Sequence, residues 1–201
     1  MKPIILASSS RYRQAQLASL GLDVPAIAPD VDETPTEQES AQQLAMRLAQ
    51  AKARAVAIRH PEALVIGSDQ VACVEVNGQP RLLGKPGNFD NAVVQLQMCQ
   101  GKTVNFYTAV CVHSESQNLS YADIDITQVH FRPLSLSAIK RYVRTEEPYD
   151  CAGSFKSEGK GILLFDAIDS RDPNSLIGLP VLLLRDLLAQ SGVDLLELAT
   201  R

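Results

Sequence analysis

Residues 4–13 read Ile-Ile-Leu-Ala-Ser-Ser-Ser-Arg-Tyr-Arg, and this stretch decides the fold class. Its four apolar residues predict a short buried strand. The serines that follow predict an N-cap, so we expect a helix from about Arg11 to Leu20, which Gly21 ends. A strand that leads directly into a helix is typical of α/β domains.

The same alternation of short apolar runs and helical patterns continues along the chain, which favours the α/β class. The second helix is the clearest: it begins near Ser40, carries one apolar stripe and ends before His60-Pro61. The stripe consists of Leu44, Leu48, Ala51, Ala55 and Ile58.

The remaining elements are expected from shorter signals. Residues 64–67 and 71–76 predict two strands around a break at 67–70, and Asn77-Gly78 predicts a turn after them. Residues 153–165 contain several glycines and predict an interrupted strand or a hairpin. Further helices are expected at about 90–99 and 136–144 and from Pro180, and further strands at about 103–113 and 120–131.

Length and composition favour one folded domain. The chain has 201 residues, of which 45% are hydrophobic and 21% are charged, so it can bury a substantial core. We expect a single domain over residues 1–201, which could be pinched into two lobes. The net charge of -4 argues against binding to nucleic acid or a membrane surface, although a local cluster of cations could hold a small anion.

The cysteines and the first residues bear on the cellular compartment. Four cysteines are present and none forms a CxxC pair, so we interpret them as reduced thiols rather than zinc ligands. The apolar run at the start is too short for a signal peptide, and no run approaches the roughly 18 residues of a membrane span. A cytoplasmic protein is expected.

The turn from the first strand to the first helix is a candidate anion site. Ser8 and Ser10 place hydroxyl groups at a helix N-terminus, whose N–H groups and positive dipole attract anions. Arg13 adds a guanidinium that can form paired hydrogen bonds to phosphate. A serine-capped helix with solvated arginines would give the same sequence, and no Walker loop is present.

Two acidic segments are candidates for metal binding or base catalysis. Asp69 follows an apolar run in Gly67-Ser68-Asp69-Gln70, and ligands of α/β sheets bind where strands end. Its carboxylate could hold Mg²⁺ or accept a proton from water, or it could stabilise a turn. Residues 30–33 contain three carboxylates, Glu33 among them, which suit a hard cation but also a solvated loop.

Three lysines could bind phosphates. Lys52 lies roughly 80° from Leu44 on the long helix, at the edge of the buried stripe, where a lysine either reaches solvent or points into a cleft. Lys85 occupies a Gly-Lys-Pro turn, which could present it to a phosphate or leave it as a loop lysine. Lys156 and Glu158 lie in a glycine-rich segment that could approach a ligand closely or form a plain hairpin.

Together these residues suggest one chemistry. The cations suit phosphate groups and the carboxylates suit a metal ion. The three histidines form no recognisable Ser-His-Asp arrangement. Hydrolysis of a phosphoanhydride by a metal-activated water fits this combination.

The order of these motifs resembles the Maf family from Ile4 to about residue 190. Seven segments carry the resemblance, and their number and order make it specific. They are Ser8-Ser9-Ser10-Arg11-Tyr12-Arg13, Val31-Asp32-Glu33-Thr34, Arg47-Leu48-Ala49-Gln50-Ala51-Lys52-Ala53, Gly67-Ser68-Asp69-Gln70, Gly84-Lys85-Pro86, Cys151-Ala152-Gly153-Ser154-Phe155 and Gly178-Leu179-Pro180.

The resemblance implies an α/β domain with one mixed sheet, two lobes and a central cleft, similar to the inosine triphosphate pyrophosphatases (the Maf/Ham fold). It implies a homodimeric hydrolase that cuts a nucleoside triphosphate between the α- and β-phosphates with a divalent metal, Mg²⁺ or Mn²⁺. By position, Asp69 would activate water, and Glu33 and Asp69 would bind the metal. The residues expected to bind the substrate are Ser8, Ser10, Arg13, Lys52, Lys85 and Lys156.

Three positions resemble one branch of the family, the 7-methyl-GTP pyrophosphatases. Tyr12 departs from the usual Ser-x-Ser-Pro-Arg-Arg opening, Gln70 stands where Thr is usual, and Glu158 stands where Gln is frequent. Methylated guanine is cationic, so Tyr12 could attract it by stacking, on the order of 1–2 kcal/mol. Glu158 could accept hydrogen bonds from the guanine N1–H and amino group. Alternatively, Tyr12 packs on its helix and Glu158 is solvated.

Three other functions stay open. The second Maf branch hydrolyses dTTP and UTP, but Tyr12, Gln70 and Glu158 argue against it. A non-catalytic nucleotide-binding regulator of cell division would not need Asp69 as a base. A ribonucleoprotein or cap-binding module is disfavoured by the acidic charge and the lack of a basic stripe.

Overall fold

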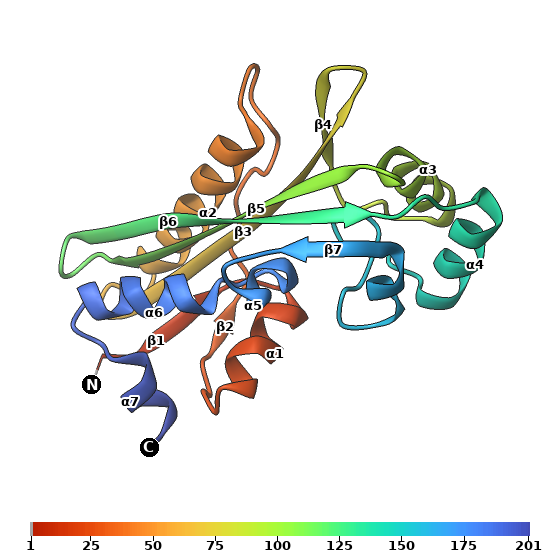
Figure 1. The fold of residues 1–201 in the computed structure, drawn as a ribbon. Coiled ribbons are helices and arrows are strands. Elements are labelled where there is room, and N and C mark those ends of the chain that lie inside the picture. Colours follow the sequence, from red (N-terminus) through yellow and green to blue (C-terminus); the bar gives the residue numbers. More distant parts are fainter. Residues whose placement is uncertain (1) are drawn as a thin grey trace. The chain divides into compact units, whose positions relative to one another are not determined.

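Strands and helices alternate along residues 2–201, the part of the chain that this computed structural model describes (Figure 1). The strands are β1 (Ile4–Ala7), β2 (Ala26–Ile27), β3 (Leu64–Val76), β4 (Gln79–Leu83), β5 (Thr103–Ser114), β6 (Leu119–Phe131) and β7 (Phe165–Asp169). The helices are α1 (Arg11–Ser19), α2 (Ala41–Ala57), α3 (Phe89–Cys99), α4 (Leu136–Glu146), the 3₁₀ helix η1 (Lys160–Leu164), α5 (Pro173–Ile177), α6 (Val181–Gln190) and α7 (Leu195–Ala199). Among the described residues, none of these helices combines the length and the apolar character that a bilayer crossing demands.

The strands form one mixed sheet. Their hydrogen-bonded order is β2-β1-β3-β5-β6-β7, and β4 pairs with β3. β1 is parallel to β2 and β3, whereas β4 and β7 are antiparallel to β3 and β6, respectively. The predicted α/β class with a mixed sheet is confirmed.

The chain divides into two compact units. The first contains the residues up to Asp69 together with 108–125 and 172–201, and the second contains 70–107 and 126–171. β3, β5 and β6 each contribute residues to both units. The single domain over residues 1–201 and the central cleft stay predictions.

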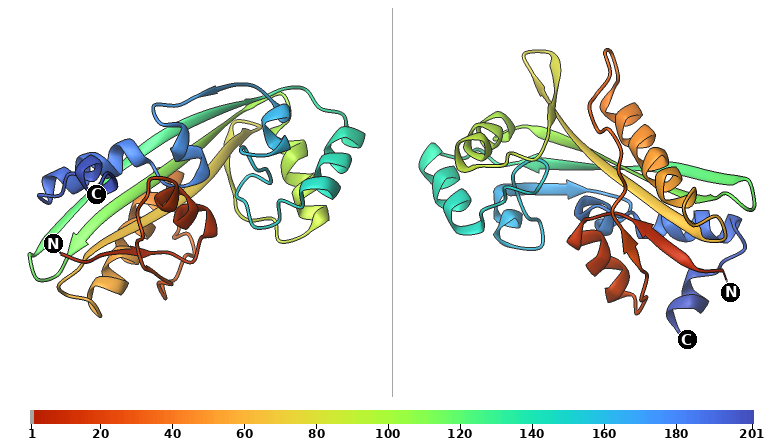
Figure 2. Two further views of the ribbon diagram at one scale, coloured as in Figure 1. Left: turned by 90° about the horizontal axis from the view of Figure 1, so that it is seen from below. Right: turned by 180° about the vertical axis from the view of Figure 1, so that it is seen from behind.

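The first unit has helices on both faces of β1 and the beginning of β3. Leu6 and Ile66 pair across the two parallel strands and pack in one core cluster with Leu17 of α1 and Leu184 of α6. α2 covers the opposite face (Figure 1), and Figure 2 shows the start of β1 close to α7. Strands that are covered on both faces are apolar at consecutive positions, and residues 64–66 follow this pattern.

The sequence sets the start of α2 by a capping box. Ser40 Oγ accepts from Gln43 N at 3.2 Å, and Gln43 Oε1 accepts from Ser40 N at 2.9 Å. The predicted stripe is partly wrong, because Ile58 is 70% exposed. The small side chains of Ala45, Ala49 and Ala53 are completely buried instead, since they let α2 lie close to the sheet.

The predicted break at residues 67–70 is wrong, because β3 runs without interruption from Leu64 to Val76. Gly67 does not end a strand but accommodates the neighbouring helix. A Cβ atom at this position would lie 2.2 Å from Ala49 O and 2.7 Å from Ala53 N. The glycine signal therefore came from helix packing rather than from a turn.

The predicted strand or hairpin at residues 153–165 is also wrong. Gly153 and Ser154 have φ angles of 78° and 62° and form a turn, which η1 follows before β7 begins. A Cβ atom on Gly161 would lie 2.3 Å from Lys156 O. The glycines thus permit a tightly folded loop, not a glycine-interrupted strand.

Four phenylalanine side chains form an aromatic cluster in the second unit. Phe155, next to this turn, lies edge-on to Phe106, Phe131 and Phe165, with ring centroids 5.4, 5.7 and 4.8 Å apart. Such contacts contribute roughly 0.5–1.5 kcal/mol per pair beyond burial. They fix the glycine-rich segment against β5, β6 and β7.

Candidate active site

Lys52 lies at the centre of a charged cluster in the first unit. It is on α2, and its side chain is only 8% exposed. Its Nζ atom lies 2.6 Å from Asp69 Oδ1 and 2.6 Å from Glu33 Oε1. A buried ammonium requires such partners, because removing an unpaired charge from water is very costly. Of the two orientations open to Lys52, the structure selects the one that faces carboxylates.

The alternation of side chains along β3 determines what Asp69 meets. Successive residues of a strand point to opposite faces. Gly67 and Asp69 share the face toward α2, where Asp69 reaches Lys52. Ser68 points the other way and lies 2.9 Å from the carbonyl oxygens of both Ala109 and Gly178. Asp69 is therefore a residue within a strand, and the prediction that it follows a strand end is wrong.

Arg13 joins the cluster from the first turn of α1. Its Nε atom donates to Gly178 O at 2.7 Å, the same carbonyl that Ser68 contacts. Burial lowers the pKa of the Arg13 guanidinium, and the negative charges of Asp69 and Glu33 act to raise it. Arg13 and Lys52 thus both lie within electrostatic reach of the two carboxylates.

Asp69 combines burial with these two cations. Burial raises the pKa of its carboxyl group above the ordinary value, while the positive charges of Lys52 and Arg13 oppose the shift. The net effect is upward. A carboxylate with a raised pKa is a stronger base, which suits a group that accepts a proton from water near neutral pH.

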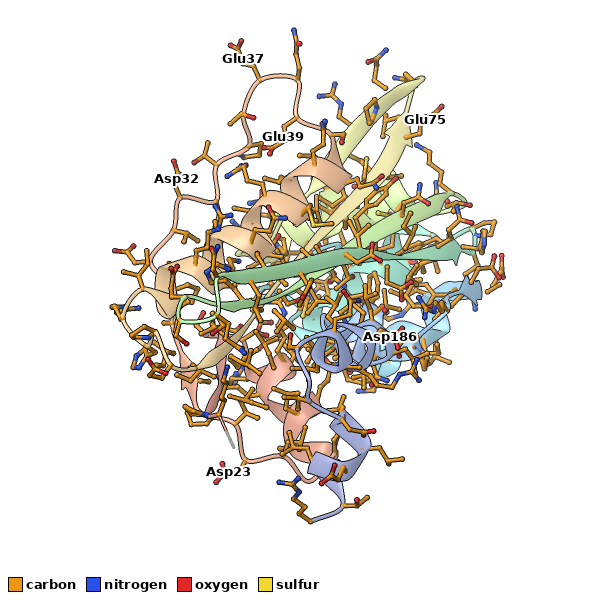
Figure 3. The ribbon with its side chains drawn as sticks, turned by 90° about the vertical axis from the view of Figure 1, so that its left-hand side faces the viewer. Asp23, Asp32, Glu37, Glu39, Glu75 and Asp186 are labelled. Carbon is orange, nitrogen blue, oxygen red and sulfur yellow. The ribbon has the colours of Figure 1, made fainter. Side chains whose placement is uncertain are left out.

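Glu33 comes from the loop between β2 and α2, along which Figure 3 labels Asp32, Glu37 and Glu39. Its side chain is 58% exposed, yet its carboxylate reaches Lys52. Asp32 instead accepts a hydrogen bond from Thr34 N at 2.9 Å, which stabilises the loop itself. Of these two neighbouring carboxylates, Glu33 belongs to the cluster and Asp32 shapes the loop.

The predicted serines are engaged in the turn between β1 and α1. Ser10 is the N-cap of α1 and accepts from Arg13 N at 3.4 Å. Ser8 is 4% exposed, and its hydroxyl accepts from Ser10 N at 3.0 Å. Both oxygens thus shape the start of the helix that carries Arg13, and their contact with substrate phosphates stays a prediction.

The chemistry of the cluster fits a divalent cation. The Asp69 and Glu33 oxygens both lie 2.6 Å from one nitrogen, so they are no more than twice that distance apart. Mg²⁺ usually binds one or two carboxylates, with substrate phosphates and water as further ligands. Throughout residues 2–201, no group of three or more His, Cys, Asp or Glu side chains is placed to hold a metal. Glu33 and Asp69 fit such an ion, and their role as its ligands, with substrate and water completing the coordination, stays a prediction.

Lys156 is bound to the end of α4 in the second unit. Its Nζ atom donates to Glu146 O at 2.7 Å, and its backbone N–H donates to Tyr142 Oη at 3.1 Å. A cation at this place satisfies a terminal carbonyl and interacts favourably with the helix dipole. The predicted contact between Lys156 and a phosphate stays a prediction beside this observed structural role.

The remaining predicted residues are divided between the units. Tyr12 is half-buried on the first turn of α1 in the first unit, whereas Gln70 and Glu158 belong to the second. Lys85 is exposed between β4 and α3, and Glu158 is exposed beside Ser157, whose hydroxyl donates to it at 3.3 Å. Convergence of Tyr12, Gln70 and Glu158 on one base stays a prediction.

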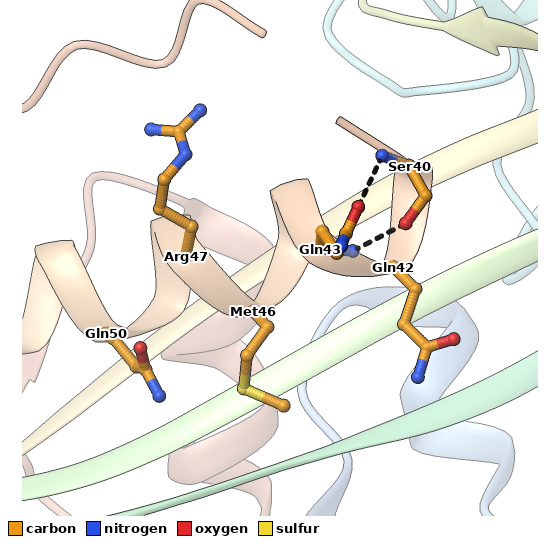
Figure 4. A pocket seen from close by; sticks show the side chains of 6 residues that line it. All are labelled: Ser40, Gln42, Gln43, Met46, Arg47 and Gln50. Atoms are coloured by element: carbon orange, nitrogen blue, oxygen red, sulfur yellow. Dashed lines mark hydrogen bonds between the residues drawn. The ribbon is translucent and has the colours of Figure 1, made fainter. Parts of the chain in front are cut away.

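A hollow also lies along the first part of α2 (Figure 4). It is lined by Ser40, Gln42, Gln43, Met46, Arg47 and Gln50. The side chains of Ser40 and Gln43 are occupied by the capping box. The predicted site residues are not among these six, so this hollow does not mark the charged cluster.

Sequence reasoning missed the residues that support the cluster. Arg47 binds the loop between β2 and α2, which we call the acidic loop. It donates to Thr34 O at 3.1 Å and pairs with Glu39. Gln16 Nε2 donates to Asn174 O at 2.8 Å and holds the segment that ends at Gly178. Arg47 and Gly178 belong to motifs of the family resemblance, which was the available signal, whereas the pattern around Gln16 gave none.

Known proteins with similar sequences and folds support the resemblance. The Maf-like protein family model matches residues 3–191. A "7-methyl-GTP pyrophosphatase" of Colwellia psychrerythraea is 48% identical over 196 residues, covering 98% of this chain and 96% of that protein. A protein of the same name from Bordetella avium is 51% identical over 191 residues, covering 95% and 94%.

Among solved structures, the Staphylococcus aureus Ham1 protein is similar with a TM-score of 0.53 at 17% identity, covering 94% of this chain and 100% of that one. This likeness confirms the predicted Maf/Ham fold. The sequence matches extend over nearly the whole chain, and the range of the family match, residues 3–191, covers the positions of all seven motifs. The chain therefore belongs to the Maf-like protein family.

Proposed function

We propose that this protein is a nucleoside triphosphate pyrophosphatase that hydrolyses 7-methyl-GTP to the monophosphate and pyrophosphate. The observation that carries the proposal is the position of Lys52 between two carboxylates with Arg13 nearby. Cations and carboxylates in one cluster suit a polyphosphate and the metal that accompanies it. The names of the relatives support the same reaction and the methylated substrate.

Asp69 would accept the proton of the attacking water. Its pKa is raised by burial, and its carboxylate is held by Lys52 at 2.6 Å, so it is oriented before substrate arrives. A general base of this kind contributes about 10²–10⁴-fold to rate. A divalent cation, when bound by Glu33 and Asp69, would polarise the scissile phosphate and lower the pKa of water.

Arg13 and Lys52 would stabilise the negative charge that develops on the phosphate oxygens. The Gly178 carbonyl accepts a hydrogen bond from Arg13 Nε and so fixes the orientation of the guanidinium. The two Nη atoms would then contact the phosphate. Cations held in place before reaction stabilise a transition state without the cost of reorganisation. Ser8, Ser10, Lys85 and Lys156 would add contacts to the triphosphate.

Selection of the methylated base would rest on Tyr12, Gln70 and Glu158. Tyr12 offers an aromatic face to a cationic ring, and Glu158 offers a carboxylate to guanine donors. This part of the proposal depends on the family resemblance and on the names of the relatives. The homodimer expected from the resemblance belongs to the proposal too, and sedimentation equilibrium would test it.

The test is pyrophosphate release with Mg²⁺ or Mn²⁺ from 7-methyl-GTP, GTP, dTTP, UTP and CTP. A preference for 7-methyl-GTP, with monophosphate as the second product, supports the proposal. Preference for dTTP or UTP would retain the pyrophosphatase and reject the base pocket. The absence of release from all five nucleotides would reject the enzymatic function. Asp186→Asn on α6, an exposed carboxylate paired with Arg185, serves as a control for charge removal.

A further inference from the structure

A second ion pair in the first unit involves Arg47 and Glu39. Arg47 Nε lies 2.7 Å from Glu39 Oε1, and Arg47 Nη2 lies 2.9 Å from Glu39 Oε2. Two parallel hydrogen bonds between a guanidinium and a carboxylate fix both distance and orientation. The Glu39 side chain is 8% exposed and that of Arg47 is 37% exposed, so the strength of the pair rests on its paired geometry rather than on exclusion of solvent.

The pair also fixes the backbone of the acidic loop. Arg47 Nη2 donates to Thr34 O at 3.1 Å, and Glu39 Oε2 accepts from Thr36 N at 3.1 Å. These hydrogen bonds restrain the loop backbone between residues 34 and 39. Its other end is fixed by α2, which begins directly after Ser40.

Glu33 is the residue next to this fastened segment. Its side chain is 58% exposed, and its carboxylate is nevertheless within 2.6 Å of Lys52. A half-exposed side chain on a loop samples many conformers unless its backbone is restrained. The hydrogen bond from Arg47 to Thr34 O, one residue away, provides that restraint.

We propose that Arg47 and Glu39 are positioning residues that present Glu33 to the divalent cation of the site. The inference rests on the proposed function only in its choice of a divalent cation as the ligand. Arg47 determines where the loop backbone lies, and Glu39 determines where the guanidinium points. Neither residue would touch the metal or the substrate.

Electrostatics give Glu39 a second part in this arrangement. Glu39 raises the pKa of the Arg47 guanidinium, and its negative charge balances the positive charge of Arg47. Asp32 and Asp69 also interact electrostatically with Arg47. Without Glu39, the Arg47 guanidinium would be uncompensated and would attract the carboxylates of the loop. Glu39→Gln should therefore loosen the loop and also redirect Arg47.

The test is direct binding of Mn²⁺ to the full-length protein without nucleotide, with free Mn²⁺ measured by electron paramagnetic resonance. Glu39→Gln and Arg47→Lys should each weaken Mn²⁺ binding by between about 10- and 100-fold, as loss of a residue that orients a metal ligand does. Pyrophosphate release at saturating Mn²⁺ should fall much less than the affinity. Arg47→Lys keeps the positive charge but loses the paired geometry, so its loss of affinity reports on position rather than on charge.

Glu197→Gln is the matched control, because Glu197 forms an exposed ion pair with Arg201 beyond α7. Its Mn²⁺ affinity should equal that of the wild type. Circular dichroism must show that each variant is folded, and the two different single variants cover the case in which one of them unfolds.

Mn²⁺ affinity within twofold of wild type in both single variants would overturn the inference. So would failure of the wild type to bind Mn²⁺. The proposed function is tested separately. If the protein binds Mn²⁺ through these residues but releases no pyrophosphate, the positioning role is retained and the proposed pyrophosphatase activity is rejected.

Discussion

Lys52 in the first unit and Lys156 in the second were both predicted to bind phosphate, and the structure gives their ammonium groups different partners. Lys52 faces the side chains of Asp69 and Glu33, whereas Lys156 faces the main-chain carbonyl of Glu146 at the end of α4. Side-chain carboxylates can exchange an ammonium for another cation, whereas a terminal helix carbonyl is a neutral acceptor whose lysine partner complements the helix dipole. The comparison teaches that the partner of a lysine indicates its role better than its neighbours in sequence do.

The largest effect is expected when the Lys52 cluster loses its base. Asp69→Asn should lower turnover by about 10²–10⁴-fold, because the amide cannot accept the proton of water. Nucleotide binding, measured by calorimetry, should change little. Near-normal turnover in this variant would show that Asp69 is not the catalytic base. The contact with Asp69 would then give Lys52 no stronger claim to a catalytic role than Lys156 has.

Substituting each lysine by methionine compares the two directly. Lys52→Met leaves two carboxylates without their cation, so stability should fall by about 3–5 kcal/mol, the usual result of breaking a buried pair. Lys156→Met removes a cation from a helix end, which is worth about 0.3–1 kcal/mol. Urea unfolding of both variants gives the two values. Equal losses would contradict different structural roles for the two lysines.

The second unit can also be tested through Glu158. Glu158→Gln should reduce the preference for 7-methyl-GTP over GTP by an amount corresponding to about 1–3 kcal/mol, the worth of a good base contact. Its effect on kcat/KM for GTP should be smaller. Equal losses on both nucleotides would exclude Glu158 from base selection and assign the second unit a structural part only.

The smallest effect concerns acid stability in the loop beside Lys52. Hydrogen bonds from Arg47 lower the pKa of Glu39 from 4.5 to about 2. A depressed pKa contributes stability that is complete above the unfolded value and is lost as pH falls toward the folded value. The difference in melting temperature between wild type and Glu39→Gln should be constant above about pH 4.5 and close toward pH 2. A difference that persists at pH 2 would contradict the pairing.

Local signals in the sequence predicted the elements that depend on local chemistry. Ser10, Ser40 and Gly21 mark helix ends through hydrogen bonds or backbone angles available within a few residues. Gly67 led to a wrongly predicted break in β3. A glycine is needed there because Ala49 and Ala53 of α2 lie against it, and that contact is not visible in the neighbouring sequence. The helices α5 and α7, with five residues each, are too short to show a helical period.

The site could be predicted only in part for the same reason. The family resemblance named Glu33, Lys52 and Asp69, and the structure brings these three together. It did not reveal that Arg47 holds the acidic loop or that Gly178 holds Arg13, because those contacts link distant segments. Their functional roles stay predictions that the experiments above address.

The hydrogen bond between Arg13 and Gly178 spans 165 residues of sequence, and this has a consequence for synthesis on the ribosome. Glu33, Lys52 and Asp69 leave the exit tunnel early, since translation proceeds from the N-terminus. The carbonyl that orients Arg13 is made 165 residues after Arg13 itself. A nascent chain can therefore gather its carboxylates and Lys52 before it can fix Arg13, and activity should be acquired only after Gly178 has been made.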